Sequence, residues 1–143
     1  MMTRDQLNGD VGAAAADEQY EYFVLGGGHV GAVLARQFHD AGHAVRLVDE
    51  RHEADDVSTV RGDPGVLATL EAADVRPDAT VVVATRDDGR NLRLAQLVRT
   101  HFDVERVRVL ANSPDHYDVF ADAGHEPVCA TAALSDALAD SSG

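Results

Sequence analysis

The sequence predicts an α/β fold of the Rossmann-like type, a doubly wound three-layer sandwich with a six-stranded parallel sheet. Two observations predict it. Short apolar runs rich in β-branched residues alternate with longer stretches of helical periodicity, and the connections between them are short. The first apolar run also leads into a glycine-rich turn followed by a helical pattern, an arrangement typical of this fold class. The length of 143 residues fits one domain.

The periodicity of the sequence gives the elements in order. Residues 1–19 show no periodicity and are interpreted as a flexible leader, so the domain is expected to cover residues 20–143. Strands are expected at residues 22–25, 44–49, 57–61, 80–84, 107–110 and 127–129. Helices are expected at residues 30–41, 64–73, 88–102, 114–123 and 132–139.

Local signals support the boundaries of these elements. Gly42 stands where a C-cap glycine would end the first helix, and Gly124 stands at the corresponding place after residues 114–123. Pro64 suits the first turn of the second helix. The run Val81-Val82-Val83 is typical of a parallel strand that is buried on both faces.

The charge of the chain excludes several classes of function. The net charge is −13, and all 12 basic residues are arginine. Such a surface has no basic stripe for nucleic acid and repels anionic lipid, and the lack of lysine excludes a P-loop or a Schiff base. The favoured interpretation is a halophilic protein adapted to a salt-rich cytoplasm; the alternative is an acidic interaction surface. No apolar run approaches the ~20 residues of a membrane span, so we expect a cytoplasmic protein without direct membrane insertion.

The glycine-rich turn carries the strongest functional signal. Gly26, Gly28 and Gly31 form a Gly-x-Gly-x-x-Gly pattern between a strand and a helix, and Asp49 ends the next strand. The first glycine permits a tight turn, the second lets the backbone approach a diphosphate, and the third lets helix and strand pack closely. The free N–H groups at the helix N-terminus would bind the anion, and the carboxylate of Asp49 would bind the ribose hydroxyls.

Asp49 also bears on the choice of nucleotide. A carboxylate at this position repels the 2′-phosphate of NADP, so NAD(H) is the expected ligand. ATP and ADP remain alternatives, because they share the adenosine and the diphosphate that this turn recognises. Arg51 is interpreted equally well as a ligand contact or as a surface ion pair. His29 is expected to be exposed and without a catalytic role.

Several further segments resemble a known family. They are Val24-Leu25-Gly26-Gly27-Gly28-His29-Val30-Gly31, Ala41-Gly42-His43-Ala44-Val45, Val48-Asp49, Val60-Arg61-Gly62-Asp63, Leu67, Ala84-Thr85-Arg86-Asp87-Asp88-Gly89-Arg90-Asn91, Ala111-Asn112-Ser113-Pro114 and Ala123-Gly124-His125. In order and spacing, residues 22 to about 134 resemble the N-terminal RCK domain (regulator of potassium conductance) of Trk- and Ktr-type potassium-uptake regulators and of ligand-gated potassium channels.

The resemblance implies further site residues. Asp63 would border the adenine or cap the following helix, and Thr85 would lie beside the phosphates. Asp87, Asp88 and Asn91 match the start of a helix, where capping is their expected role. The expected cofactor-binding set is Gly26, Gly28, His29, Val30, Gly31, Asp49, Glu50, Arg51, Gly62, Asp63, Ala84, Thr85 and Arg86.

The resemblance implies a regulatory function. We expect an NAD(H)-binding module that controls potassium transport through a membrane transporter partner, with no catalytic residues and no metal site. The alternatives are a nucleotide-sensing domain of a DHH-type phosphoesterase, since RCK-like domains occur fused to such enzymes, and an NAD-dependent oxidoreductase. The family also implies a homodimer. The apolar face of the last helix, formed by Ala133, Leu134, Ala137 and Leu138, would either build that interface or pack onto the sheet.

Overall fold

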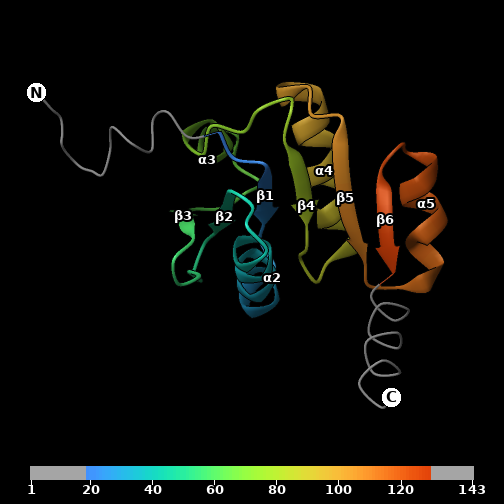
Figure 1. Ribbon diagram of the computed structural model, residues 1–143. Helices are drawn as coiled ribbons and strands as arrows, with labels where there is room; N and C mark the ends of the chain where they lie inside the picture. Colours follow the sequence, from blue (N-terminus) through green and yellow to red (C-terminus); the bar gives the residue numbers. More distant parts are fainter. Residues whose placement is uncertain (1–18, 130–143) are drawn as a thin grey trace, which may run out of the picture.

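The computed structural model describes residues 19–129 of the chain. Nearly all of the expected leader (1–19) and the whole of the expected last helix (132–139) lie outside these residues. The described part forms a six-stranded sheet in which every neighbouring pair of strands is parallel. The strand order is β3-β2-β1-β4-β5-β6 (Figure 1). This order confirms the doubly wound Rossmann-like fold.

The six strands follow the expected runs within one or two residues. They are β1 (Tyr22–Leu25), β2 (Val45–Asp49), β3 (Ser58–Arg61), β4 (Thr80–Val83), β5 (Arg106–Ala111) and β6 (Glu126–Cys129). Every residue of β4 is buried, as its continuous β-branched sequence predicts. Because β1 and β4 lie side by side in the middle of the sheet, their carboxyl ends meet at its centre.

The helices are α2 (Gly28–Asp40), α3 (Leu67–Ala72), α4 (Asp88–Phe102) and α5 (Tyr117–Asp122), the last preceded by a 3₁₀ turn over Pro114–His116. Three of them, α2, α3 and α5, start two or three residues away from the predicted ranges. The helix predicted at 64–73 begins only at Leu67, because residues 63–66 form a turn. In this turn the Asp63 carboxylate accepts from the Gly65 N–H, and its carbonyl accepts from the Val66 N–H.

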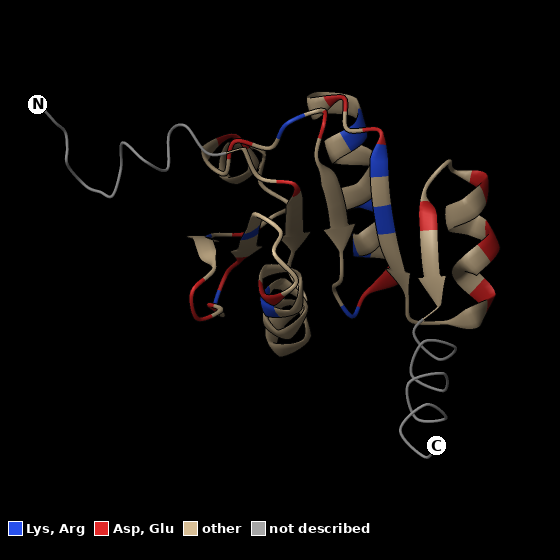
Figure 2. Cartoon of the chain, in the orientation of Figure 1, with Lys and Arg blue, Asp and Glu red and all other residues tan. Residues whose placement is uncertain are grey.

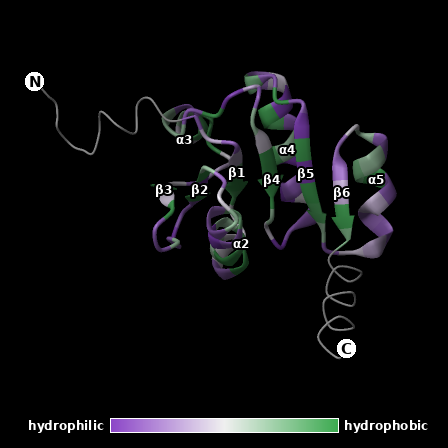
Figure 3. Ribbon diagram, viewed as in Figure 1, coloured by the Kyte–Doolittle hydropathy of each residue, from purple (hydrophilic) through white to green (hydrophobic). Residues whose placement is uncertain are grey.

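The helices divide unequally between the two faces of the sheet. On one face, side chains of α3, α4 and α5 pack with alternate residues of the strands; Phe23, Leu70, Leu94 and Phe120 belong to this cluster. On the opposite face, α2 packs over β1 and β2. These clusters form the two interfaces of a three-layer sandwich. On the second face, α2 is the one described helix, and the half of the sheet formed by β4, β5 and β6 carries no described helix (Figures 1 and 3).

Charged side chains follow the elements unevenly. Acidic residues gather on α5 and on the loops, whereas β5 carries the basic residues Arg106 and Arg108 (Figure 2). Among the helices of residues 19–129, none combines the length and the hydropathy that a bilayer crossing requires.

A buried histidine lies between α5 and β6. The side chain of His125 is 5% exposed, and neither ring nitrogen has a hydrogen-bond partner among residues 19–129. Burial lowers the pKa of His125 below its ordinary value, and the positive charge of Arg99 on α4 lowers it further. Both effects favour the neutral form of this imidazole in the folded protein.

The replacement His125→Phe is expected to remove a loss of stability that the unmodified chain undergoes on acidification from about pH 7.5 to about pH 5. The unfolded chain takes up a proton near the ordinary pKa of 6.5, whereas the folded chain does so only at a lower pH. Acidification through this range thus favours the unfolded state, and this contribution levels off below the folded pKa. Urea unfolding of both proteins at several pH values measures the difference. Parallel pH dependences would contradict the assignment.

Candidate functional site

A pocket opens at the carboxyl edge of the sheet, where the chain leaves β1 for α2 and β4 for α4. In a doubly wound sheet, these two connections run to opposite faces and leave a crevice between them. The pocket has a volume of about 320 Å³. Its lining residues are Gly26, Gly27, Gly28, Asp49, Glu50, Arg51, His52, Pro64, Thr85 and Arg90.

The floor of the pocket is the turn between β1 and α2. Gly26, Gly27 and Gly28 all have a positive φ, at 69°, 94° and 56°. Residues other than glycine rarely adopt this backbone conformation. A Cβ atom on Gly27 would lie 2.8 Å from the carbonyl oxygen of Ala84. The turn therefore needs glycine for both its backbone conformation and its close contact with the end of β4, and it brings the N-terminus of α2 to the pocket.

The carboxylate of Asp49 lies beside this turn and is 5% exposed. It accepts hydrogen bonds from the backbone N–H groups of Gly28 (3.1 Å), Arg51 (2.9 Å) and His52 (3.0 Å). Burial raises the pKa of Asp49, but these three bonds and the charge of His52 together hold the pKa below its ordinary value. The site thus contains a fixed anion that joins the glycine turn to the loop after β2.

An arginine bridges the two sides of the pocket. The guanidinium of Arg90, in the first turn of α4, lies 2.6 Å from the Asp63 carboxylate and 3.5 Å from that of Glu50. It connects α4 with the loops that follow β2 and β3. On the opposite side, the His52 imidazole lies 3.5 Å from Asp49 and over Gly28. Both anionic and cationic groups therefore surround the pocket.

A buried polar network supports the pocket from below. Asn91 is fully buried; its side-chain oxygen accepts from the backbone N–H and the hydroxyl of Thr85, and its amide nitrogen donates to the carbonyls of Thr85 and Leu110. Asp88 accepts from the backbone N–H groups of Asn112 and Ser113. Burial raises the pKa of Asp88, but hydrogen bonds from Asn112, Ser113 and His116 outweigh burial and bring the pKa below its ordinary value. The network fixes α4 to the carboxyl ends of β4 and β5.

The structure brings together about half of the predicted site residues. Gly26, Gly28, Asp49, Glu50, Arg51 and Thr85 line the pocket. His29, Val30 and Ala84 instead line a separate apolar groove on the side of the sheet that carries α2. Of the remaining predicted residues, which are Gly31, Gly62, Asp63 and Arg86, none lines this pocket directly.

These remaining residues have identifiable places. Gly31 is buried beneath the turn, and a Cβ atom there would overlap the carbonyl oxygen of Gly26. Gly62 packs closely against Thr69 of α3, and Arg86 is exposed at the start of the loop after β4. Asp63 pairs with Arg90 and caps the turn of residues 63–66, not α3 as the capping alternative proposed.

One of the three residues that were expected to cap the start of α4 does so in the structure. Asp87 caps the helix, because its carboxylate accepts from the backbone N–H of Arg90 at 3.1 Å. Asp88 and Asn91 instead bond to strand ends and to the loop after β5. The side chain of Arg51 is exposed and forms no ion pair with another residue in the range 19–129.

Sequence reasoning missed four residues that line the pocket, namely Gly27, His52, Pro64 and Arg90. Gly27 lies between Gly26 and Gly28 of the predicted glycine motif, so the motif itself could have identified it as a pocket residue. Arg90 lies in the first helical turn after a central strand, a place that parallel sheets direct toward the ligand edge. His52 and Pro64 lie in loops whose path no periodicity predicts.

Comparisons with known proteins agree with this arrangement. The family model described as the TrkA-N domain matches residues 22–131. The glutathione-regulated potassium-efflux system protein KefC of Cronobacter sakazakii is 31% identical over 136 residues, which are 87% of this chain and 22% of that protein. The Trk system potassium uptake protein TrkA of Mycobacterium tuberculosis is 32% identical over 106 residues, which are 70% of this chain and 48% of that protein. The chain thus spans less than half the length of these relatives.

Solved structures of two proteins share the fold. The NAD(P)-binding domain of an exopolyphosphatase-related protein from Archaeoglobus fulgidus superposes with a TM-score of 0.73 and 26% identity, covering 86% of this chain and 97% of that one. The structure of GsuK bound to ADP superposes with a TM-score of 0.70 and 25% identity, covering 83% of this chain and 32% of that one. Both proteins are named for ligands that contain an adenosine diphosphate unit.

Proposed function

Because the chain belongs to the TrkA-N domain family, we propose that it is an NAD(H)-binding regulatory domain that controls potassium transport. Membership of this family confirms the resemblance to the RCK domain. The geometry of the pocket supports the proposed binding of a nucleotide. Three successive left-handed glycines present the N-terminus of α2 to a pocket that also holds the ionised carboxylate of Asp49.

This pair of features suits the two halves of an adenosine diphosphate. The backbone N–H groups at the start of α2 and the helix dipole favour a diphosphate. The carboxylate of Asp49 is a hydrogen-bond acceptor suited to the ribose hydroxyls, and its negative charge disfavours a 2′-phosphate. NAD(H) is therefore the proposed ligand. ADP and ATP are the alternatives, since GsuK is named as bound to ADP.

The curated relatives support regulation rather than catalysis. KefC and TrkA are named as potassium efflux and uptake proteins. We propose that the domain acts through a membrane transporter partner and that it forms a homodimer, as its family implies. Potassium-transport relatives favour this function over a phosphoesterase-associated sensor.

Thermal unfolding in the presence of nucleotides tests the ligand. NAD⁺, NADH, NADP⁺, ADP and ATP are compared at equal concentration in a salt-rich buffer. A ligand present at a hundred times its dissociation constant stabilises the folded state by about 2.7 kcal/mol, which is readily measured. We expect NAD⁺ or NADH to stabilise more than NADP⁺. Failure of every adenine nucleotide to shift the transition would overturn the proposal.

The replacement Asp49→Asn is expected to weaken NAD(H) binding by about tenfold to a hundredfold, because charged hydrogen bonds to the ribose contribute about 1.5–3 kcal/mol. Asp55→Asn is the matched control. It makes the same change in charge at an exposed carboxylate that pairs with Arg36 outside the pocket. Isothermal titration calorimetry measures both affinities. Equal affinities in the two variants would show that Asp49 does not contact the ligand.

A further inference from the structure

A histidine lies over the glycine turn of the nucleotide pocket. A Cβ atom on Gly28 would lie 3.4 Å from Cε1 of His52, 3.7 Å from its Nδ1 and 3.9 Å from its Nε2. Gly28 is the second glycine of the motif, the one whose missing side chain lets a diphosphate approach the backbone. A diphosphate bound against Gly28 would therefore lie within contact distance of the imidazole of His52.

Hydrogen bonds in the loop after β2 fix the position of this ring. The backbone N–H groups of Arg51 and His52 donate to the carboxylate of Asp49, at 2.9 and 3.0 Å. The N–H of Gly28 donates to the same carboxylate at 3.1 Å, so Asp49 holds the loop against the first residue of α2. The side chain of His52 is 46% exposed and lines the pocket. The imidazole is thus held between a buried carboxylate and the space where a nucleotide would bind.

Charged side chains surround His52 within the pocket. Its Nδ1 lies 3.5 Å from the carboxylate of Asp49 at the end of β2. The loop adds Glu50 and Arg51, and α4 adds Arg90, whose guanidinium lies 3.5 Å from the Glu50 carboxylate. The pKa of Asp49 lies below its ordinary value, so this carboxylate stays ionised between about pH 8 and about pH 6. Among these types of side chain, histidine is the one that normally exchanges a proton in this range.

Protonation changes what this ring can donate. A neutral imidazole has one N–H group, whereas an imidazolium has two. An imidazolium at position 52 can donate from Nδ1 to Asp49 and from Nε2 to a phosphate oxygen at the same time. It also places a positive charge beside the diphosphate, and hydrogen bonds between ionised groups are the stronger kind. The protonated ring therefore suits a bound diphosphate better than the neutral ring does.

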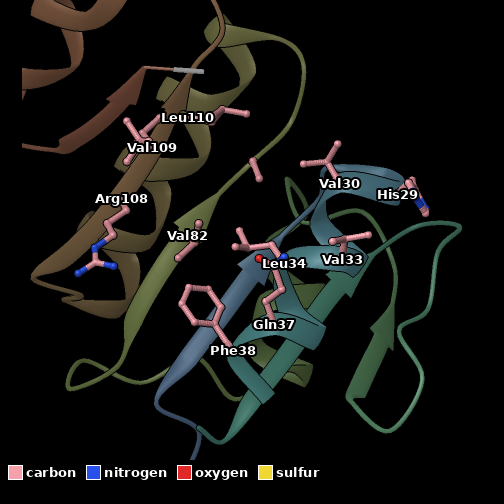
Figure 4. A pocket seen from close by; sticks show the side chains of 12 residues that line it. His29, Val30, Val33, Leu34, Gln37, Phe38, Val82, Arg108, Val109 and Leu110 are labelled. Carbon is pink, nitrogen blue, oxygen red and sulfur yellow. The ribbon is translucent and has the colours of Figure 1, made fainter. Parts of the chain in front are cut away.

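His29, the other histidine near the turn, lies in a different place. It is exposed and lines the separate apolar groove (Figure 4). Among the described residues that line the nucleotide pocket, His52 is the one histidine.

We propose that His52 binds the diphosphate of the nucleotide in its protonated form, so that nucleotide binding takes up a proton. This inference rests on the proposed nucleotide binding and adds a regulation of that binding by pH. Because the diphosphate favours the imidazolium, the imidazolium favours the diphosphate by the same factor. The affinity for nucleotide therefore rises as the pH falls from about 8 to about 6. Since the ring is nearly half exposed and salt screens its charge, we expect a rise of about threefold to tenfold.

Isothermal titration calorimetry with NAD⁺ at about pH 8 and about pH 6 tests this linkage. NAD⁺ is the probe because neither of its phosphates gains a proton in this range, unlike the terminal phosphate of ADP or ATP. We expect the unmodified chain to bind NAD⁺ about threefold to tenfold more tightly at the lower pH. Titrations near neutral pH in two buffers of different ionisation enthalpy measure the proton uptake itself. Circular dichroism verifies that the protein is folded at both pH values.

His52→Gln and His39→Gln form a matched pair of variants. His39 is also about half exposed and lies 3.4 Å from a carboxylate, that of Asp40, but it is outside the pocket. His52→Gln is expected to bind NAD⁺ equally at both pH values, as weakly as the unmodified chain at about pH 8, and without proton uptake. His39→Gln is expected to retain the pH dependence. His52→Arg carries a permanent positive charge and is expected to bind equally, but more tightly, at both pH values.

The outcomes separate this inference from the function on which it rests. Binding of NAD⁺ by the unmodified chain with equal affinity at both pH values would overturn the inference and leave the proposed function intact. Proton uptake that persists in His52→Gln would assign the proton to another group and would also overturn the inference. Absence of NAD⁺ binding at both pH values would overturn the NAD(H) proposal and this inference with it.

Discussion

The replacement Gly31→Ala is expected to reduce the free energy of unfolding by about 3 kcal/mol or more, although it adds a single methyl group. A Cβ atom at this position would overlap the carbonyl oxygen of Gly26 and touch Val24 of β1. Neither atom belongs to a flexible side-chain end that can turn away. The helix would have to move off the strand, which would also displace the N-terminus of α2 from the pocket.

Gly89→Ala is the control for this prediction. It makes the same replacement in the first turn of α4, where the nearest atom to the new methyl group is a side-chain oxygen of Asp87 at 3.3 Å. Alanine favours a helix over glycine by about 1 kcal/mol, so this variant is expected to retain its stability within about that amount. Guanidinium unfolding at constant salt measures both. A loss below about 1 kcal/mol for Gly31→Ala would show that α2 can move without cost.

The second large effect is expected for Asn91→Leu, at about 3–5 kcal/mol. Leucine has nearly the same size as asparagine but cannot hydrogen-bond. The backbone N–H of Thr85 and the carbonyl of Leu110 would lose the partners that Asn91 supplies. Because Thr85 lines the pocket, the variant is expected to weaken nucleotide binding as well as stability.

Gln96→Leu supplies the matched control on the same helix. It exchanges an amide for an apolar group of similar size at an exposed position, where the change is expected to stay within about 0.5 kcal/mol. Urea unfolding gives both free energies, and calorimetry with NAD⁺ gives the affinity. If Asn91→Leu proved as harmless as Gln96→Leu, the network would contribute little to the folded state.

Much of the fold was predictable because its signals are local. Short apolar runs predicted the six strands, and Gly42, which has a left-handed backbone in the structure, marked the end of α2. The start of α3 was wrong by three residues. Pro64 suits both a helix start and a turn, and the side-chain bond from Asp63 to Gly65 favours the turn.

The candidate site was predictable only in part. The glycine motif and Asp49 have fixed spacings, so the sequence alone placed them together. The bridge from Arg90 to Glu50 and Asp63 depends on the path of two loops, which no local pattern specifies. His29 and Val30 follow the same turn, but the first turn of the helix directs them to the groove and away from the pocket.

The helix α2 belongs to both concave regions of the domain. Its first residue, Gly28, lines the nucleotide pocket, and its flank from Val30 to Phe38 lines the apolar groove. Molecules bound in the two regions would therefore contact the same helix. If a nucleotide shifts α2 and changes the affinity of the groove for its occupant by some factor, the occupant must change the affinity for the nucleotide by the same factor.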